Sequence, residues 1–270
     1  MRRMSAFNVV SLTLGFAFLY IPMVILVVYS FNASKLVTVW AGFSTKWYGE
    51  LIRNEAFLDA AWVTVKVGVL SSTFATVLGT MAAYVMVRRG SFRGRTLFSG
   101  MIYAPLVMPE VITGLSLLLL FIAIGLDRGV LTIVLAHTTF SMCYVSVVVS
   151  SRLVSFDRSL EEAALDLGCT PFQGFRLVTL PIIAPAVLAG WLLAFTLSLD
   201  DLVIASFTAG PSATTLPIKI FSSVRLGVSP EINALSTIII GLVVSGVIVA
   251  SLVSKHRIAA RSAEERAAID

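Results

Sequence analysis

The sequence predicts an all-α, polytopic membrane protein with six transmembrane helices. Of its 270 residues, 57% are hydrophobic and 13% are charged, whereas a typical soluble domain has about 25% charged residues. The mean hydropathy is +0.94, and a soluble fold of this size could not bury so much apolar surface. The composition therefore excludes a secreted disulfide scaffold, a nucleic-acid-binding domain and a disordered chain.

Six apolar runs supply the predicted spans, because each is long enough to cross a bilayer core as a helix of about 20 residues. They cover residues 9–31, 60–87, 97–125, 130–151, 182–207 and 232–253. The runs are continuously apolar, whereas the strands of a barrel would alternate apolar and polar residues. We expect residues 1–270 to form a single transmembrane domain around these spans.

Three of the runs carry local signals that support their assignment. The first is longer than the apolar core of a signal peptide and is followed by no cleavage pattern, so we expect it to be retained as a helix. Pro105 and Pro109 lie inside the third run and predict a kink there. The sixth is preceded by Ser229 and Pro230, which are typical of an N-cap and a first helical position.

The positive charges between the runs predict the orientation of the chain. Thirteen Lys and Arg residues fall in one alternating set of segments and six fall in the other. Most of this difference comes from the cluster Arg88, Arg89, Arg93 and Arg95. Because positive residues concentrate on the cytoplasmic side of a membrane protein, both termini are predicted to lie in the cytoplasm.

The segment between the fourth and fifth runs, residues 152–181, is predicted to form two short helices joined by a turn, and we call it the elbow. Ser159 and Glu162 have the spacing of a capping box, which predicts the start of the first helix. Gly168 suits the left-handed residue that ends such a helix. Thr170, which precedes a proline, predicts the start of the second helix.

One face of the first elbow helix is apolar and shallow, because two of its four residues are alanines. That face comprises Leu160, Ala163, Ala164 and Leu167. An acidic flank beside it comprises Glu161, Glu162 and Asp166. The alternative is an amphipathic helix lying on lipid, but such a helix prefers a basic flank. We therefore expect this face to contact a protein partner.

Residues 162–164 read Glu-Ala-Ala, Gly168 follows after three residues, and residues 178–181 read Val-Thr-Leu-Pro after nine more. This pattern resembles the EAA motif of ABC importer permeases, with Val178 in place of Ile as the one departure. The resemblance implies a type I ABC importer permease fold, in which the elbow is a cytoplasmic coupling helix between helices 4 and 5 that docks on an ATPase. The residues implied in that coupling are Glu161, Glu162, Ala163, Ala164, Leu167 and Gly168.

The likeness extends to polyamine permeases, which residues 40–48, 198–204, 206–211, 214–217 and 229–235 resemble. It implies a non-catalytic, multi-pass subunit of the bacterial inner membrane that carries putrescine and/or spermidine. The implied partners are a second related permease in a heterodimer, two cytoplasmic ATPase subunits, a periplasmic substrate-binding protein and membrane lipid, with no nucleic acid. The ATPase would bind ATP and Mg²⁺, and this chain no cofactor or metal. The alternative is a permease for another small cationic or organic solute.

Passage of a flexible polycation needs separated carboxylates and apolar or aromatic walls. The runs contain three acids and a single Lys or Arg, Lys66. We predict a substrate path lined by Asp201, Asp200, Ser198, Glu110, Phe195 and Trp40. In one continuous helix, Phe195, Ser198 and Asp201 would approximately share a face. Asp200 would then be a second contact or a member of an ion pair.

Structural roles are the alternatives for several of these polar and aromatic residues. Glu110 could be a hydrogen-bond acceptor, and Trp40 an anchor at the membrane interface. Lys66 either extends toward the interface or pairs with one of the two aspartates. His137, inside the fourth run, is expected to be a packed polar residue.

Two other classes of function have less support. Inverted repeats would favour a stand-alone secondary transporter, but the sequence has no convincing internal repeat. A membrane-embedded enzyme would carry a motif such as His-Glu-x-x-His or Gly-x-Ser-x-Gly, and neither occurs. A phosphate loop is also absent from the sequence, so any ATP must be hydrolysed by another subunit.

Overall fold

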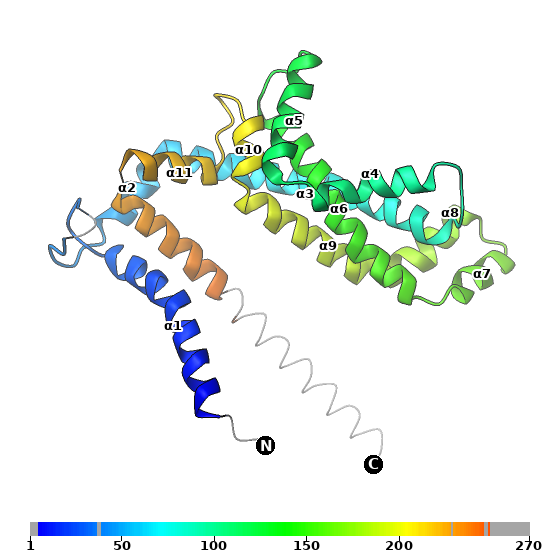
Figure 1. Ribbon diagram of the computed structural model, residues 1–270, viewed down its shortest axis with the longest axis horizontal. Coiled ribbons are helices and arrows are strands. Elements are labelled where there is room, and N and C mark those ends of the chain that lie inside the picture. Colours follow the sequence, from blue (N-terminus) through cyan, green and yellow to red (C-terminus); the bar gives the residue numbers. More distant parts are fainter. Residues whose placement is uncertain (1–4, 37–38, 228, 246–247, 249–270) are drawn as a thin grey trace. The chain divides into compact units, whose positions relative to one another are not determined.

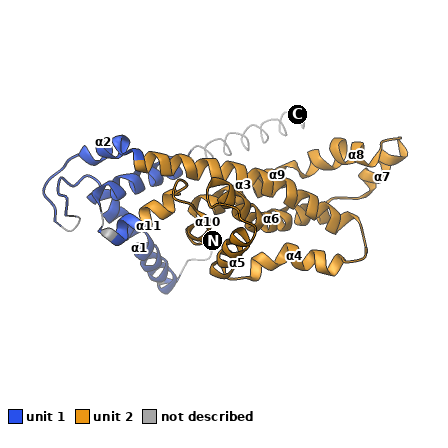
Figure 2. Cartoon of the chain, turned by 90° about the horizontal axis from the view of Figure 1, so that it is seen from above, with its two compact units in different colours: residues 1–55, 222–270 blue, residues 56–221 orange. Residues whose placement is uncertain are grey.

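The computed structural model describes residues 5–36, 39–227, 229–245 and 248 (Figure 1). In these ranges the chain is helical, and its one strand-like pairing is an isolated bridge between Asn32 and Phe43. The all-α class is therefore confirmed. Residues Met1–Glu55 and Ser222–Asp270 make up one compact unit, and residues Ala56–Phe221 make up a second (Figure 2).

Within the described residues, four helices are long and apolar enough to cross a membrane. They are α1 (Ala6–Tyr29), α3 (Glu55–Arg88), α6 (Val130–Ser155) and the continuous helix Pro171–Asp200 that contains α9 (Leu180–Asp200). The sixth predicted run is helical over Pro230–Ser245, and its remainder, apart from Ile248, lies outside the described residues. The presence of six spans stays a prediction.

In the first unit, the end of α1 is held to the segment that follows it. The side chain of Asn32 accepts the backbone N–H of Ala41 at 2.9 Å and donates to the carbonyl of Val39 at 2.8 Å. The indole of Trp47, in α2 (Lys46–Arg53), donates to the backbone carbonyl of Asn32 at 2.7 Å. Further along, Ser229 accepts the N–H of Glu231 at 3.3 Å, which confirms the predicted N-cap of the last described helix.

In the second unit, α3, α6 and α9 approach one another closely through small residues. A Cβ added at Gly79 would lie 2.7 Å from the carbonyl oxygen of Met142, and one added at Gly190 would lie 3.2 Å from Cγ1 of Val145. The core around them also contains the fully buried alanines Ala75, Ala83 and Ala194. Small residues at helix contacts are typical of membrane proteins, because they let two backbones approach.

The third predicted span is not one kinked helix, so the expectation of a single helix over 97–125 was wrong. The chain forms α4 (Arg95–Val107) and α5 (Glu110–Ala123), whose axes differ by 117°. The break occurs at Met108, which is extended with ψ 137°, and at Pro109. Proline disfavours a helical conformation in the residue before it and supplies no N–H, so the two residues end one helix before the next begins.

The fifth predicted span, 182–207, also differs, because its helix stops at Asp200. A separate helix, α10 (Val203–Thr208), follows after Asp201, which has an extended ψ of 122°. The tight spacing between α5 and α10 is evident at Gly114, where an added Cβ would lie 2.7 Å from the ring of Phe207. Nearby, α11 (Leu216–Leu226) begins with the N–H of Leu216 donated to the Thr64 hydroxyl at 2.7 Å.

Candidate functional site

The elbow contains the two short helices that its sequence predicts. They are α7 (Ser159–Asp166) and α8 (Pro171–Gly174), and Gly168 between them has the left-handed φ of +90°. The hydroxyl of Thr170 accepts the N–H of Gln173 at 3.3 Å, as expected for its capping role. The second helix is not separate, however. It continues through a π-helix, Phe175–Thr179, into α9.

The predicted capping box at the start of α7 does not form. The carboxylate of Asp157 accepts the N–H of Ser159 at 3.0 Å, and Glu162 pairs instead with Arg158 at 3.2 Å. Asp157 therefore accepts a free backbone N–H at the start of α7. The sequence had predicted Ser159 as the capping residue there. Hydrogen bonds from the backbone and the side chain of Ser159 lower the pKa of the Asp157 carboxyl below its ordinary value.

The apolar face predicted for α7 is divided in the structure. Leu160 is 50% exposed and Leu167 is 87% exposed, and Ala163 between them is also exposed. Ala164 is 7% exposed and packs inward. Leu160, Ala163 and Leu167 thus form an exposed apolar strip, which we call the α7 strip.

The acidic flank of α7 is divided in the same way. Glu162 is solvent-facing, whereas Glu161 is largely buried and points toward the body of the chain. One carboxylate oxygen of Glu161 lies 2.8 Å from Nε of Arg88, and the other accepts the hydroxyl of Thr179 at 2.7 Å.

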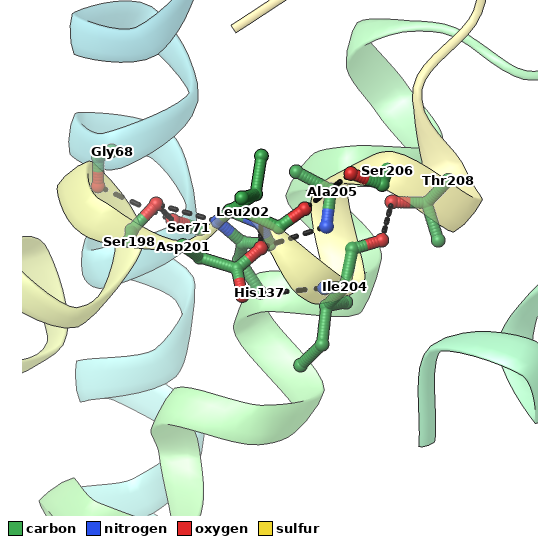
Figure 3. A network of polar contacts seen from close by, with 10 residues as sticks. All are labelled: Gly68, Ser71, His137, Ser198, Asp201, Leu202, Ile204, Ala205, Ser206 and Thr208. Atoms are coloured by element: carbon green, nitrogen blue, oxygen red, sulfur yellow. Dashed lines mark hydrogen bonds and ion pairs between the residues drawn. The ribbon is translucent and has the colours of Figure 1, made fainter. Parts of the chain in front are cut away.

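A second candidate region is a buried polar network that joins α3, α6 and the end of α9 (Figure 3). The ring of His137 is 2% exposed; its Nδ1 lies 2.7 Å from the Ser198 hydroxyl and its Nε2 lies 3.1 Å from Oδ2 of Asp201. The hydroxyl of Ser71 reaches Ser198 at 3.2 Å. The imidazole of His137 therefore lies between the Ser198 hydroxyl and the Asp201 carboxylate in this network.

Asp201 also forms the cap of α10. Its carboxylate accepts the N–H of Ile204 at 3.3 Å and the N–H of Ala205 at 2.7 Å, which Figure 3 shows as dashed lines. A carboxylate at this position satisfies backbone donors that the first turn of a helix leaves free. Asp201 lies beyond the end of α9, so the predicted common helical face with Phe195 does not exist. The base that contacts Asp201 is His137 and not Lys66.

The other predicted path residues lie in different settings. Asp200 is exposed on this chain at the last residue of α9, and Glu110 is exposed at the first residue of α5, where the helix dipole favours a negative charge. Phe195 stacks on Trp191 with ring centroids 5.2 Å apart. Trp40, in the first unit, packs edge to face with Tyr29 at 6.1 Å. A substrate path through these residues stays a prediction.

Comparison with known proteins decides the family of the chain. A family model described as "Binding-protein-dependent transport system inner membrane component" matches residues 75–261. The chain belongs to this family. That membership confirms the predicted family of ABC importer permeases and makes this chain an inner-membrane permease component.

Two relatives from Escherichia coli strain K12 are similar over most of this permease. The putrescine transport system permease protein PotI is 62% identical over 245 residues, which are 88% of this chain and 87% of PotI. The spermidine/putrescine transport system permease protein PotC is 44% identical over 246 residues, which are 91% of this chain and 93% of PotC.

Solved structures place the permease among ABC transporters by fold. A chain of a bacterial ABC transporter involved in the import of the acidic polysaccharide alginate superposes with a TM-score of 0.71 at 19% identity, covering 92% of this chain and 94% of the other. A chain of the MetNI methionine ABC transporter in inward-facing conformations superposes with a TM-score of 0.60 at 17% identity, covering 77% and 95%. These likenesses support the type I permease fold.

Sequence reasoning missed part of both regions of this permease. It treated Arg88 only as a topology signal and did not include Ser71. His137 had one available signal, because it is the one histidine inside a predicted span. Among the described residues, no group of three or more His, Cys, Asp or Glu side chains is placed to hold a metal ion.

Proposed function

We propose that this chain is the membrane-spanning permease subunit of an ATP-driven importer for polyamines, putrescine and/or spermidine. The observation that carries the proposal is the 62% identity to PotI over 88% of this chain, supported by the 44% identity to PotC over 91%. An alignment that covers 88% of this chain spans both helix breaks. The chain is then half of the translocation path and has no catalytic residue of its own.

Acidic groups at the helix breaks suit a cationic substrate. Asp200 is exposed at the end of α9 and Glu110 at the start of α5, so both carboxylates can meet an ammonium group. Asp201 already accepts hydrogen bonds from α10 and contacts His137, so we assign it to holding the break beside Asp200. Phe195 on α9 remains our proposed wall for the methylene chain of the substrate.

The α7 strip is proposed as the contact with a cytoplasmic ATPase subunit. Its leucines are exposed on either side of Ala163, so a partner surface can approach closely. Glu162 and Gly168 lie beside that contact, while Glu161 and Ala164 support it from within. We propose two such ATPase subunits, which bind ATP and Mg²⁺ while this chain binds no cofactor.

A single chain exposes its acids and cannot enclose a charged substrate, so a second related permease subunit is proposed to complete the path. A periplasmic binding protein would deliver the substrate. Both termini would lie in the cytoplasm, in keeping with the positive charges that flank the predicted spans.

The test is an uptake experiment on the complete complex in cells that lack other polyamine importers. Radiolabelled putrescine and spermidine are supplied with unlabelled amines, or with the neutral diol of the same carbon chain, as competitors. We expect uptake that the amines inhibit and the diol does not. Inhibition by neutral solutes, or absence of amine uptake by an assembled complex, would overturn the proposed substrate.

A matched pair of variants tests the path within this experiment. Asp200→Asn should raise the KM for dicationic and tricationic amines at least tenfold, because the ammonium loses a charged partner. Asp127→Asn makes the same chemical change at an exposed acid between α5 and α6 and should leave KM unchanged. Equal kinetics for Asp200→Asn and the unmodified complex would remove Asp200 from the path.

A further inference from the structure

We infer that Glu161 is a positioning residue that fastens α7 to the last residue of α3 and to the π-helical start of α9, so that a displacement of α7 moves both helices. The inference rests on the proposed coupling function. It differs from the role that the sequence suggested for Glu161, which was a place in the contact with the ATPase.

Both carboxylate oxygens of Glu161 are occupied within this chain. One lies 2.8 Å from Nε of Arg88, the last residue of α3, and the other accepts the hydroxyl of Thr179 at 2.7 Å. The side chains of Glu161 and Arg88 are only 14% and 12% exposed. A largely buried charge that loses its partner is costly, so the geometry resists separation of the three residues.

Arg88 is itself held from a second side. Its guanidinium lies 5.3 Å from the ring centroid of Phe156, the buried residue that directly follows α6. The cation therefore meets an aromatic face on one side and the Glu161 carboxylate on another. As a result, α7 has a fixed connection to the end of α3 rather than a mobile surface contact.

The connection to α9 passes through the π-helix. Thr179, its last residue, is fully buried, and Phe175, its first residue, packs edge to face on Tyr84 of α3 at 5.0 Å. Tyr84 and Arg88 are four residues apart and share one face of α3. The π-helix is thus held to α3 directly by Tyr84 and indirectly through Glu161. Single-turn π segments often occur at functional sites.

The second ion pair of α7 provides a contrast on the same helix. Arg158 and Glu162 lie 3.2 Å apart, but their side chains are 65% and 62% exposed. Exposed i,i+4 pairs contribute little, because water screens the charges. Loss of Arg158 should therefore leave the position of α7 unchanged, while loss of Glu161 should release α7 from α3 and α9.

The test uses the complete complex reconstituted in liposomes, with ATP hydrolysis and polyamine uptake measured together. In complexes that assemble, Glu161→Ala should reduce the substrate imported per ATP hydrolysed at least tenfold. Arg88→Gln and Glu161→Gln should each reduce this ratio, and the double variant should be no worse than the more severe single one. Arg158→Gln is the control and should match the unmodified complex.

A distance measurement separates this inference from the proposed substrate, because it needs no polyamine. Spin labels at residues 89 and 166, both exposed, report the separation of the α3 end from α7; Cys169 is replaced by serine and Cys143 is buried. We expect the same narrow distance distribution in nucleotide-free and ATP-trapped complexes, and a broadened one in Glu161→Ala.

Three results would overturn the inference. The first is an unchanged import-to-ATP ratio in Glu161→Ala. The second is a double variant Arg88→Gln, Glu161→Gln in which the two losses of this ratio add up. The third is a spin-label distance distribution in Glu161→Ala that is as narrow as in the unmodified complex. If Glu161→Ala fails to assemble, Glu161→Gln and Thr179→Val answer the same question with smaller changes. A complex with a narrow label distribution that broadens in Glu161→Ala, but with no import of polyamine, would contradict the proposed substrate alone.

Discussion

Replacement of His137 by leucine tests whether the buried network holds the break between α9 and α10. The substitution places an apolar side chain of similar size in α6 and removes both ring nitrogens. Ser198, which is 4% exposed, then retains Ser71 as its partner, and Asp201 loses its contact at 3.1 Å. Asp201 keeps the two backbone N–H groups of α10.

The expected loss follows from these contacts. Removal of one partner from a buried pair costs about 3–5 kcal/mol. The two backbone N–H donors that remain on Asp201 reduce this cost to about 2–3 kcal/mol, in the range for a buried polar group that loses one partner. For a chain of this size, such a change lowers the melting temperature by about 4–12 °C. His137→Gln should recover much of the loss, because its amide can both donate to Asp201 and accept from Ser198.

The assay is thermal denaturation of the assembled transporter in detergent, followed by the loss of its monodisperse peak in size-exclusion chromatography. Thr139→Ala is the control in the same helix, because the exposed Thr139 hydroxyl bonds only to the carbonyl of Leu135, one turn back, at 2.8 Å. If His137→Leu melts within about 1 °C of the control, less than the effect of one net hydrogen bond, the network does not stabilise the break.

Three further predictions concern packing and the elbow. Gly79→Ala should lower the melting temperature, since the added methyl meets the carbonyl of Met142 at 2.7 Å and overpacking costs about 1–3 kcal/mol; Gly100→Ala, with nothing within 4 Å, should not lower it. Gly168→Val should impair uptake without preventing membrane insertion, because a β-branched residue at φ +90° strains the turn; normal uptake at equal expression would show that the turn is dispensable. Ala163→Glu should abolish co-purification of the ATPase without changing the melting of the permease, and retained co-purification would place the contact elsewhere.

The sequence predicts the elements that local patterns encode. Apolar runs locate the helices, and Gly168 and Thr170 mark the turn of the elbow, because left-handed glycines and helix caps depend on neighbouring residues. The break after Val107 was predicted only as a kink at Pro105 and Pro109, and the break after Asp200 was not predicted. Both lie inside continuous apolar runs, where hydropathy carries no signal for the end of a helix.

The parts of the site that were missed depend on contacts between distant segments. The network of His137 and Asp201 joins residues 64 positions apart, as their numbers in the sequence give. Arg88 and Glu161 are similarly far apart along the chain. Helical periodicity places Glu161 on an acidic flank, but it cannot tell which member of that flank turns toward a partner inside the protein. That choice depends on tertiary packing.

The early ends of α4 and α9 have a consequence for experiments on ion selectivity. The last turn of any α-helix has carbonyl oxygens without an intrahelical donor, and those oxygens carry a partial negative charge. Here two such turns, ending at Val107 and Asp200, stand within apolar segments. No side-chain substitution can delete a main-chain oxygen. If the proposed path is right, some preference for cations should therefore persist after Asp200 and Glu110 have both been neutralised.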